Sequence, residues 1–349
     1  MLDKLQGKVT VIYPEIAVAG GTKTYVDNLF MGLDKLGLIY QKVPIKKREY
    51  SIAGRPRFGF ISQILNANFK HARTSIAHSL SPSSVIRGTN IVTVHDVLPL
   101  IQRDLYMRSR LQKISFNITL RRILNTQFLL VSSNIGKMQL LSHTNIDESR
   151  LFVLPLAINH EAFYPSSKNP GYPDHKIKVV MVSDFNPRKR IDIAIQALGN
   201  DNDIEFFHIG PINSWKNVYD EVKQMSKKFK NIHLMGQMDV DSVRSYISFA
   251  DVFLYLTENE GFGLPPIEAL ACGTNVIVSD IQIFHENLGD IAFYARNDEF
   301  SADLVKEVIK KKKKREELVS FSEKYSIKNH AVRLTEIYTE VLEMTHGKG

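Results

Sequence analysis

The stretch Glu260-Gly261-Phe262-Gly263-Leu264-Pro265-Pro266-Ile267-Glu268-Ala269-Leu270-Ala271-Cys272-Gly273 carries the strongest structural signal in this chain. It follows the apolar run 252–256, has two glycines near its start, and continues with two prolines at the beginning of a helical pattern. This order is typical of a strand that ends in a turn and leads into a helix. The glycines let backbone N–H groups approach a ligand closely, and the start of a helix favours an anion.

Two glutamates in this stretch point to a binding site. We expect Glu260 in the turn and Glu268 in the first turns of the helix, so that one carboxylate reaches a sugar while the other accepts hydrogen bonds from ribose hydroxyls. The alternative is a plain strand–turn–helix in which Glu268 only complements the helix dipole. Because the whole pattern is long and specific, we favour ligand binding. The turn that binds this sugar-nucleotide ligand, the donor, then also contains Phe262, Gly263 and Leu264.

A basic loop follows another expected strand. The strand 178–182 leads into Ser183-Asp184-Phe185-Asn186-Pro187-Arg188-Lys189-Arg190. A loop at the carboxyl end of a parallel strand is where a diphosphate would bind, and basic side chains supply the matching charge. We therefore predict that Arg188 and Lys189 bind a diphosphate. A solvated basic loop is the alternative.

Short apolar runs alternate with helical periodicity along the rest of the chain, which favours an α/β fold with parallel sheets. Residues 166–176 contain Pro170, Gly171 and Pro173, so we predict a linker there between domains 1–165 and 177–327, followed by a helix within 328–349. We interpret the basic run 310–315 as one solvated end of a helix. The expected strands are 9–13, 75–78, 91–94, 128–132, 151–154, 178–182, 204–209, 232–234, 252–256 and 275–278. The expected helices include 25–36, 191–198, 241–249, 265–271 and 328–344.

The first half offers weaker site candidates. Gly20 and Gly21 precede the first helix and allow backbone amides to face an anion there; a plain tight turn is the alternative. His95 ends the strand 91–94 and is either a sugar contact or a satisfied polar group. Ser133, beside Ser132 and Asn134, is equally consistent with a strand-end site and with a helix N-cap.

The glutamate stretch closely resembles the donor-site signature of the family 4 glycosyltransferases. This resemblance implies the GT-B architecture, in which two Rossmann-like domains face each other across a cleft, the first binding the acceptor and the second the donor. It also implies that the C-terminal helix within 328–349 crosses back to the first domain. It implies that Glu260 lies beside the transferred sugar, that Glu268 binds the nucleotide ribose, that His95 contacts the sugar, and that Lys189 is the diphosphate-binding lysine. The family usually has Gly-Arg where this sequence has Ser183-Asp184, and Arg188 is our candidate for the missing charge.

Composition restricts the setting of this activity. The chain has 349 residues, 44% of them hydrophobic, and a single cysteine, so no internal disulfide is expected and a reducing, cytoplasmic compartment is favoured. The formal net charge is +8, and no carboxylate occurs between Glu49 and Asp96. The basic first half is compatible with an anionic membrane, an anionic acceptor or nucleic acid, or with a simple solubilising surface.

We expect transfer of a hexose, with retention of configuration, from a nucleoside diphosphate sugar such as GDP-mannose or UDP-glucose to a hydroxyl of a glycan or lipid-linked acceptor. Glu260, His95 and Lys189 are the expected catalytic residues. We expect no cofactor, no metal and no nucleic acid; the pairs Asp201/Asp203 and Asp239/Asp241 are interpreted as turn and cap residues. The alternatives are a non-catalytic sugar-nucleotide-binding subunit and a GT-B epimerase or phosphorylase. A nicotinamide dehydrogenase is disfavoured because the dinucleotide fingerprint is missing.

One segment suggests a location. Residues 103–124 mix Arg108, Arg110, Lys113, Arg121 and Arg122 with leucine, isoleucine and phenylalanine, and have Asp104 as their one acidic residue. Such a segment can lie on an anionic membrane, so peripheral association with the inner face of the membrane is expected. Packing of the apolar residues into the core of the first domain is the alternative.

Overall fold

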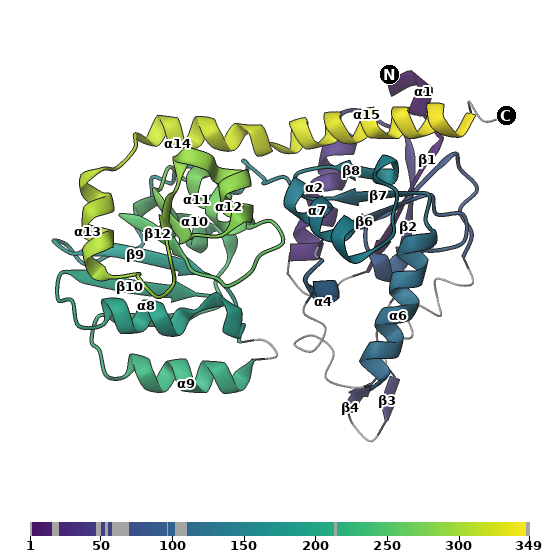
Figure 1. Cartoon of the computed structure of the whole chain (residues 1–349). Helices are drawn as coiled ribbons and strands as arrows, with labels where there is room; N and C mark the ends of the chain where they lie inside the picture. Colours follow the sequence, from purple (N-terminus) through teal and green to yellow (C-terminus); the bar gives the residue numbers. More distant parts are fainter. Residues whose placement is uncertain are drawn as a thin grey trace. The chain divides into compact units, whose positions relative to one another are not determined.

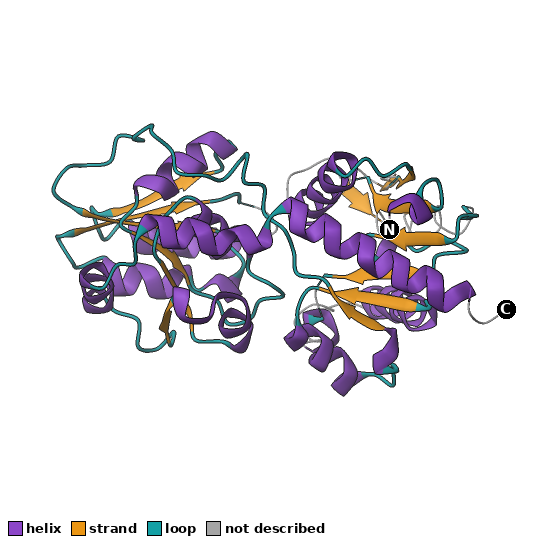
Figure 2. Ribbon diagram, turned by 90° about the horizontal axis from the view of Figure 1, so that it is seen from above, coloured by secondary structure: helices purple, strands orange, loops and turns teal. Residues whose placement is uncertain are grey.

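The computed structural model describes residues 2–15, 21–46, 50–52, 55–57, 70–95, 97–101, 110–212 and 215–346. The chain divides into two compact units, the first made of residues 1–157 and 327–349 and the second of residues 158–326. Each unit contains a six-stranded parallel sheet with helices on its faces (Figures 1 and 2). The predicted α/β class with two Rossmann-like units is confirmed. No helix within the described ranges is long and apolar enough to span a bilayer.

The sheet of the first unit has the strand order β2-β1-β5-β6-β7-β8. Its strands are β1 (Val9–Pro14), β2 (Tyr40–Ile45), β5 (Ile76–Ser79), β6 (Ile91–Val94), β7 (Phe128–Val131) and β8 (Leu151–Val153). A short antiparallel pair, β3 (Tyr50–Ile52) and β4 (Arg55–Arg57), lies outside this sheet. The helices are α1 (Leu2–Leu5), α2 (Gly21–Lys35), α4 (Leu98–Ile101), α6 (Arg110–Asn125), α7 (Asn134–His143) and α15 (Ile327–His346).

Helix α15 completes the core of the first unit although it follows the whole second unit in sequence. Its side chains Leu334, Ile337 and Tyr338 are fully buried and join the core cluster that contains Leu29 and Leu33 of α2. The two helices approach closely at Gly32, where an added Cβ would lie 2.8 Å from the Cβ of Ala331. Glycine at this position therefore permits the contact between α2 and α15.

The sheet of the second unit has the strand order β11-β10-β9-β12-β13-β14. Its strands are β9 (Ile177–Val182), β10 (Ile204–Ile209), β11 (Ile232–Gly236), β12 (Val252–Tyr255), β13 (Val276–Ser279) and β14 (Phe293–Ala295). The helices are α8 (Ile191–Leu198), α9 (Lys216–Ser226), α10 (Val240–Phe249), α11 (Leu264–Ala271), α12 (Gln282–Leu288), α13 (Ala302–Lys310) and α14 (Arg315–Ser322). Helices α8 and α9 lie on one face of the sheet, and α10, α11 and α12 lie on the other (Figure 1).

The order of these strands creates a topological switch point. From β9 the chain winds outward through β10 and β11, then returns to place β12 on the other side of β9 and continues through β13 and β14. In open parallel sheets, ligands bind outside the carboxyl ends of the strands at such a point. The loops that leave β9 and β12 there are residues 183–190, here named the cation loop, and residues 256–263, here named the Glu260 turn.

Residues 166–176, where the sequence predicted a linker, pack against α10. The backbone N–H of Ser166 donates to Ser248 Oγ at 3.0 Å, and the hydroxyl of Tyr172 donates to the carbonyl of Tyr246 at 2.7 Å. These residues belong to the second unit. The chain passes from one unit to the other between Ala157 and Ile158, and again between Ser326 and Ile327.

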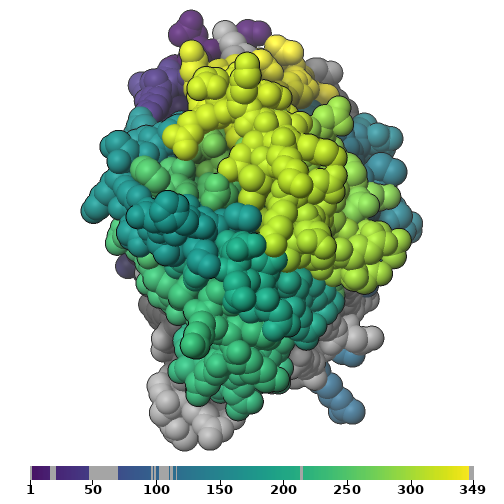
Figure 3. Space-filling model, turned by 90° about the vertical axis from the view of Figure 1, so that its left-hand side faces the viewer, coloured from purple at the N-terminus to yellow at the C-terminus, as the bar shows by residue number. Residues whose placement is uncertain are grey.

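The basic run 310–315 was interpreted as one solvated end of a helix, and it begins with Lys310, the exposed last residue of α13. The run then continues through a short irregular connection to Arg315, the first residue of α14. The side chain of Asn275 binds both backbone atoms of Lys313, which holds this connection in place. Helices α13 and α14 lie on the surface of the second unit, in yellow-green in Figure 3.

Candidate functional site

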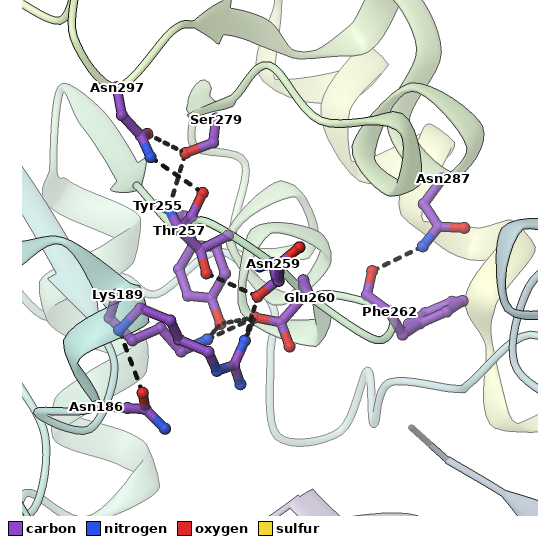
Figure 4. Close-up of polar contacts among 11 residues, drawn as sticks. Asn186, Lys189, Tyr255, Thr257, Asn259, Glu260, Phe262, Ser279, Asn287 and Asn297 are labelled. Carbon is purple, nitrogen blue, oxygen red and sulfur yellow. Dashed lines mark hydrogen bonds and ion pairs between the residues drawn. The ribbon is translucent and has the colours of Figure 1, made fainter. Parts of the chain in front are cut away.

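The carboxylate of Glu260 receives hydrogen bonds from three side chains of the second unit. Its Oε2 atom lies 2.5 Å from Lys189 Nζ, 3.0 Å from Arg188 Nη1 and 3.1 Å from the hydroxyl of Tyr255 (Figure 4). Lys189 Nζ also donates to the Tyr255 oxygen at 2.5 Å. The side chains of Lys189 and Glu260 are 6% and 12% exposed. The structure therefore joins the two sequence motifs in one buried cluster at the switch point.

The charges in this cluster are coupled. Burial by itself would raise the pKa of Glu260, but the positive charges and hydrogen bonds of Lys189 and Arg188 lower it to about 2. Burial raises the pKa of Tyr255 well above its usual range, so this phenol is a neutral hydrogen-bond donor. At neutral pH the cluster thus contains an ionised carboxylate held by cations and by one neutral hydroxyl.

The cation loop is shaped by a side-chain cap and a proline. Asn186 Oδ1 accepts the backbone N–H of Arg188, and Pro187 begins a short 3-10 turn, Pro187–Lys189. The carbonyl of Arg188 accepts the backbone N–H of Glu258 at 2.8 Å, and Arg188 Nη1 donates to the carbonyl of Asn259. Backbone and side chain of Arg188 therefore tie the cation loop to the Glu260 turn.

Asp184, which departs from the family pattern, lies in the same loop. Its charge acts on Lys189, although more weakly than those of Glu260 and Arg188. The adjacent Ser183 is buried and shares a 3.1 Å hydrogen bond with His208 Nε2. An added Cβ at Gly210 would lie 1.7 Å from the carbonyl oxygen of Ser183, so the start of the cation loop requires a glycine directly after the neighbouring strand β10. Arg188, one residue before Lys189, supplies the second cation of the cluster.

Gly263 sets the geometry between the Glu260 turn and α11. It has a positive φ of 87°, and an added Cβ would lie 2.4 Å from Phe284. Leu264 then begins α11 with Pro265 directly after it, as the sequence predicted for this turn. Phe262 is 3% exposed, and its carbonyl accepts a hydrogen bond from Asn287 Nδ2 at 2.7 Å (Figure 4).

Glu268 lies on α11. No hydrogen bond or ion pair of its carboxylate occurs among the described residues. Burial raises its pKa to about 7. A carboxylate that is desolvated without a protein partner is destabilised, and a ligand hydroxyl that donates to it would relieve that cost.

The candidates of the first unit have a different environment. The ring of His95, which follows β6, lies edge-on to Tyr25 with centroids 4.4 Å apart, and its Nε2 lies 2.8 Å from the carbonyl oxygen of Leu80. Burial lowers the pKa of His95 to about 4, partly opposed by that hydrogen bond. Because a carbonyl can only accept, Nε2 carries the proton, and the neutral ring has Nδ1 as an acceptor.

The glycine and serine candidates give mixed results. Gly20 lies outside the described residues. Gly21 begins α2, but an added Cβ there would meet nothing within 4 Å, so packing does not require glycine. Ser133 is the N-cap of α7, and its side chain accepts the backbone N–H of Gly136. Of the two alternatives for Ser133, the structure shows the helix cap.

The two aspartate pairs have local roles. Asp239 caps α10 by accepting the backbone N–H of Ser242, and Asp201 accepts the backbone N–H of Asp203. Both Asp201 and Asp203 pair with Lys306. The interpretation as cap and turn residues is confirmed. Tyr255 was missed by sequence reasoning, although its place at the end of a buried strand beside the glutamate motif was a usable signal.

Comparison with solved structures identifies the fold. The chain superimposes on sucrose-phosphate synthase from Thermosynechococcus elongatus with a TM-score of 0.77 and 16% identity, covering 97% of this chain and 100% of that one. HepE from Anabaena, solved with UDP and glucose, superimposes with a TM-score of 0.73 and 11% identity, covering 96% of this chain and 100% of that one. WaaG, a glycosyltransferase involved in lipopolysaccharide biosynthesis, superimposes with a TM-score of 0.65 and 14% identity, covering 96% of this chain and 98% of WaaG. The fold is GT-B.

The second unit matches a known protein family. Residues 165–325 match the profile described as "Glycosyl transferases group 1", which spans nearly the whole of that unit. This segment of the chain is therefore similar to the group 1 glycosyltransferases, in agreement with the resemblance to family 4.

Curated relatives extend the comparison to sequence. The O-antigen chain mannosyltransferase RfbU of Salmonella typhimurium is 27% identical over 211 residues, which cover 60% of this chain and 57% of RfbU. The GPI3 subunit of the phosphatidylinositol N-acetylglucosaminyltransferase of Saccharomyces cerevisiae is 24% identical over 234 residues, 62% of this chain and 51% of GPI3. The chain thus spans little more than half the length of these relatives.

Proposed function

We propose that this protein transfers a hexose from a nucleoside diphosphate sugar to an acceptor hydroxyl. The observation that carries the proposal is the convergence of Arg188, Lys189 and Glu260 at the switch point of the second sheet, beside the start of α11. Two cations suit the diphosphate of a donor, and the carboxylate suits the hydroxyls of its sugar.

The catalytic contribution of these residues is electrostatic. Negative charge grows on the diphosphate as the bond to the sugar breaks, and Lys189 and Arg188 stabilise that charge without the aid of a metal. When the diphosphate binds, these cations exchange part of their contact with Glu260 for contact with phosphate oxygens. The carboxylate is then available to orient the sugar and to stabilise positive charge at its anomeric carbon.

The remaining donor contacts follow from α11 and its approach. Glu268, desolvated and without a described partner, would accept hydrogen bonds from the ribose hydroxyls. Phe262, Gly263 and Leu264 would bring backbone N–H groups close to the donor, since the positive φ of Gly263 turns the chain into the helix there. In the first unit, Nδ1 of neutral His95 would accept a hydrogen bond from a sugar hydroxyl, and Gly20 and Gly21 stay candidates for binding the donor through backbone N–H groups.

Retention of configuration rests on the resemblance to family 4, in which attack on the same face as departure needs no protein nucleophile. GDP-mannose and UDP-glucose are the first donors to test, because RfbU is named a mannosyltransferase and HepE was solved with UDP and glucose. We place acceptor binding in the first unit and donor binding in the second. The acceptor proposed is a lipid-linked or cell-surface glycan, as the names of RfbU and WaaG suggest for those proteins.

We also propose a cytoplasmic protein that associates peripherally with an anionic membrane through α6. The exposed face of this helix presents Ile114 and Ile118, 57% and 42% exposed, together with exposed Arg110, Lys113 and Arg121. The opposite face is apolar and contributes Ile123 to the core of the first unit. Exposed isoleucines among basic side chains suit the interfacial region of an anionic bilayer.

A donor screen followed by product analysis tests the activity. Nucleotide sugars that raise the melting temperature of the purified chain are incubated with candidate acceptors, and Lys189→Ala is compared with the wild type. Transfer by the wild type and loss of turnover in Lys189→Ala are expected. An isomerised nucleotide sugar would indicate an epimerase, and a sugar phosphate would indicate a phosphorylase. Binding without turnover with any acceptor would favour a non-catalytic subunit.

A further inference from the structure

Three polar residues form a closed ring of hydrogen bonds at the start of the Glu260 turn. Ser279 Oγ accepts the backbone N–H of Thr257 at 2.7 Å and donates to Asn297 Oδ1 at 2.6 Å, while Asn297 Nδ2 donates to the carbonyl of Thr257 at 3.3 Å (Figure 4). Both backbone polar groups of Thr257 are therefore satisfied by the pair of side chains, here named the Asn297–Ser279 bridge. Thr257 and Ser279 are 0% and 1% exposed.

The sheet brings these residues together from distant parts of the sequence. Thr257 follows β12, Ser279 ends β13, and Asn297 lies in the turn after β14. The three strands are neighbours and parallel, so their carboxyl ends lie at one edge of the sheet. The bridge thus ties the start of the Glu260 turn to the two strands on the far side of β12 from the cation loop.

The bridge acts on the site through a short chain of contacts. Thr257 Oγ1 donates to the carbonyl of Asn259 at 2.9 Å, and the same carbonyl accepts from Arg188 Nη1. Glu260 is the next residue, and its carboxylate is held by Arg188 and Lys189. The carbonyl of Asn259 is therefore fixed between the bridge on one side and the cation loop on the other.

We propose that Asn297 is a positioning residue for the transfer reaction, which sets the place of the Glu260 carboxylate through Ser279 and Thr257. This inference rests on the proposed function of the Glu260 cluster. Asn297 does not contact that cluster, and its amide is required in one orientation, because the oxygen must accept from Ser279 and the nitrogen must donate to Thr257. Aspartate has the same shape but no donor, and would place an acceptor opposite the carbonyl of Thr257.

The chain offers a matched control at the other end of β13. Asn275 precedes this strand, is buried, and also binds one residue with both ends of its amide: Oδ1 accepts from Lys313 N and Nδ2 donates to Lys313 O. Asn275→Asp therefore makes the same chemical change and loses an equivalent bond, but in a connection between α13 and α14. If the loss of an asparagine bridge affects only the stability of the fold, Asn297→Asp and Asn275→Asp show the same effect.

The test compares Asn297→Asp, Ser279→Ala, their double variant and Asn275→Asp by steady-state transfer kinetics and thermal unfolding. For Asn297→Asp we expect kcat to fall about tenfold, the effect of one hydrogen bond, with KM for the donor changed less than about twofold. The double variant is expected to be no slower than the slower single variant, since both break one ring. Asn275→Asp is expected to lose thermal stability and keep kcat. Equal kcat values for Asn297→Asp and Asn275→Asp would overturn the inference.

A second measurement does not depend on turnover. The titration of the Glu260 side chain, followed by carbon NMR in labelled protein, is expected to move toward higher pH in Asn297→Asp, because a displaced carboxylate loses contact with its cations, and to stay unchanged in Asn275→Asp. An unchanged titration in Asn297→Asp would contradict the inference even if no donor is found. Lack of transfer by the wild type, with the titration shifted as expected, would instead count against the proposed function alone.

Discussion

Glu260 Oε2 and Lys189 Nζ lie 2.5 Å apart, so the anion and the cation expected to contact different parts of a donor bind each other. The pair is nearly enclosed, and Arg188 shares the same carboxylate oxygen. Burial removes each charge from water, which has a desolvation cost. The ion pair and the additional hydrogen bonds from Arg188 and Tyr255 offset that cost. A diphosphate must therefore compete with Glu260 for the two cations.

This competition predicts opposite effects on binding and turnover in Glu260→Gln. The neutral amide keeps the shape but releases the cations, so affinity for a nucleoside diphosphate is expected to rise roughly tenfold, the value of a charge-assisted contact. Turnover is expected to fall because the sugar loses its carboxylate. Calorimetric titration with the nucleoside diphosphate, beside transfer assays, measures both.

The control for that variant is Glu258→Gln. Glu258 pairs with Arg190 at 3.0 Å and its side chain is 50% exposed, so its removal is expected to leave diphosphate affinity unchanged. Weaker diphosphate binding in Glu260→Gln than in the wild type would show that Arg188 and Lys189 do not form the phosphate site.

From the raised pKa of Glu268 we predict a trade-off between the free energy of unfolding and nucleotide affinity. Its pKa is raised from 4.5 to about 7, so the folded chain holds a proton that the unfolded chain has lost. The contribution of Glu268 to the free energy of unfolding is fully present below pH 4.5 and is lost as the pH rises to about 7. Glu260 has a lowered pKa, so its contribution is present above pH 4.5 and is lost as the pH falls toward 2. Glu268→Gln is expected to raise the unfolding free energy at pH 8 by on the order of 2 kcal/mol.

At pH 8, where the Glu268 carboxylate is ionised, the same variant is expected to weaken nucleotide binding about ten- to hundredfold, because the ribose loses a charged acceptor. Denaturant unfolding at pH 5 and pH 8 and titration with nucleoside diphosphate measure the two effects. Equal stability gains at both pH values would refute the raised pKa of the Glu268 carboxyl, and undiminished nucleotide affinity would remove Glu268 from the ribose site.

Asp184 predicts a gain of function. Its negative charge acts on Lys189 and opposes an incoming diphosphate, so Asp184→Asn is expected to tighten nucleoside diphosphate binding a few-fold, by the loss of one like charge. The gain is expected to shrink as salt rises. Asp220→Asn on α9, where Asp220 pairs with exposed Lys216, is the surface control. A loss of affinity in Asp184→Asn would mean that Asp184 itself supports the donor site.

The face of α6 predicts salt-sensitive membrane binding. The wild type is expected to sediment with anionic vesicles at low salt and less at high salt, and Ile114→Gln with Ile118→Gln is expected to weaken this association. Met138→Gln on α7, where the methionine is 65% exposed, is the control for a lost apolar side chain. Equal recovery of the wild type with neutral and anionic vesicles would exclude the proposal.

Buried, continuous apolar strands were predictable from the sequence. The strands 91–94 and 204–209 have the predicted bounds, because every residue of the first and nearly every residue of the second is buried. Strand β2 was missed since Gln41 and Lys42 are exposed at the edge of the sheet and Pro44 interrupts the pattern. Strand β14 has three residues, too few to show a period.

The site could be predicted as two motifs but not as one cluster. The glycine and proline pattern around Glu260 and the basic residues at 188–190 depend on local chemistry, which a sequence displays. The contact of Glu260 with Lys189 depends on β9 and β12 being neighbours, and the ring through Asn297 depends on β12, β13 and β14 being neighbours. Asn297 lies in no motif, so only the register of the sheet reveals its relation to Glu260.

Helix α15 gives the chain an unusual order of assembly. The second unit is synthesised as one continuous segment, whereas the first waits for residues 327–346 to supply Leu334, Ile337 and Tyr338 to its core. On the ribosome, the second unit can close its core while the first still exposes the apolar surface that α15 covers. Interruption of translation after residue 326 but before α15 is complete would therefore leave a finished second unit attached to an aggregation-prone first unit, and chaperone demand should concentrate on the amino-terminal residues.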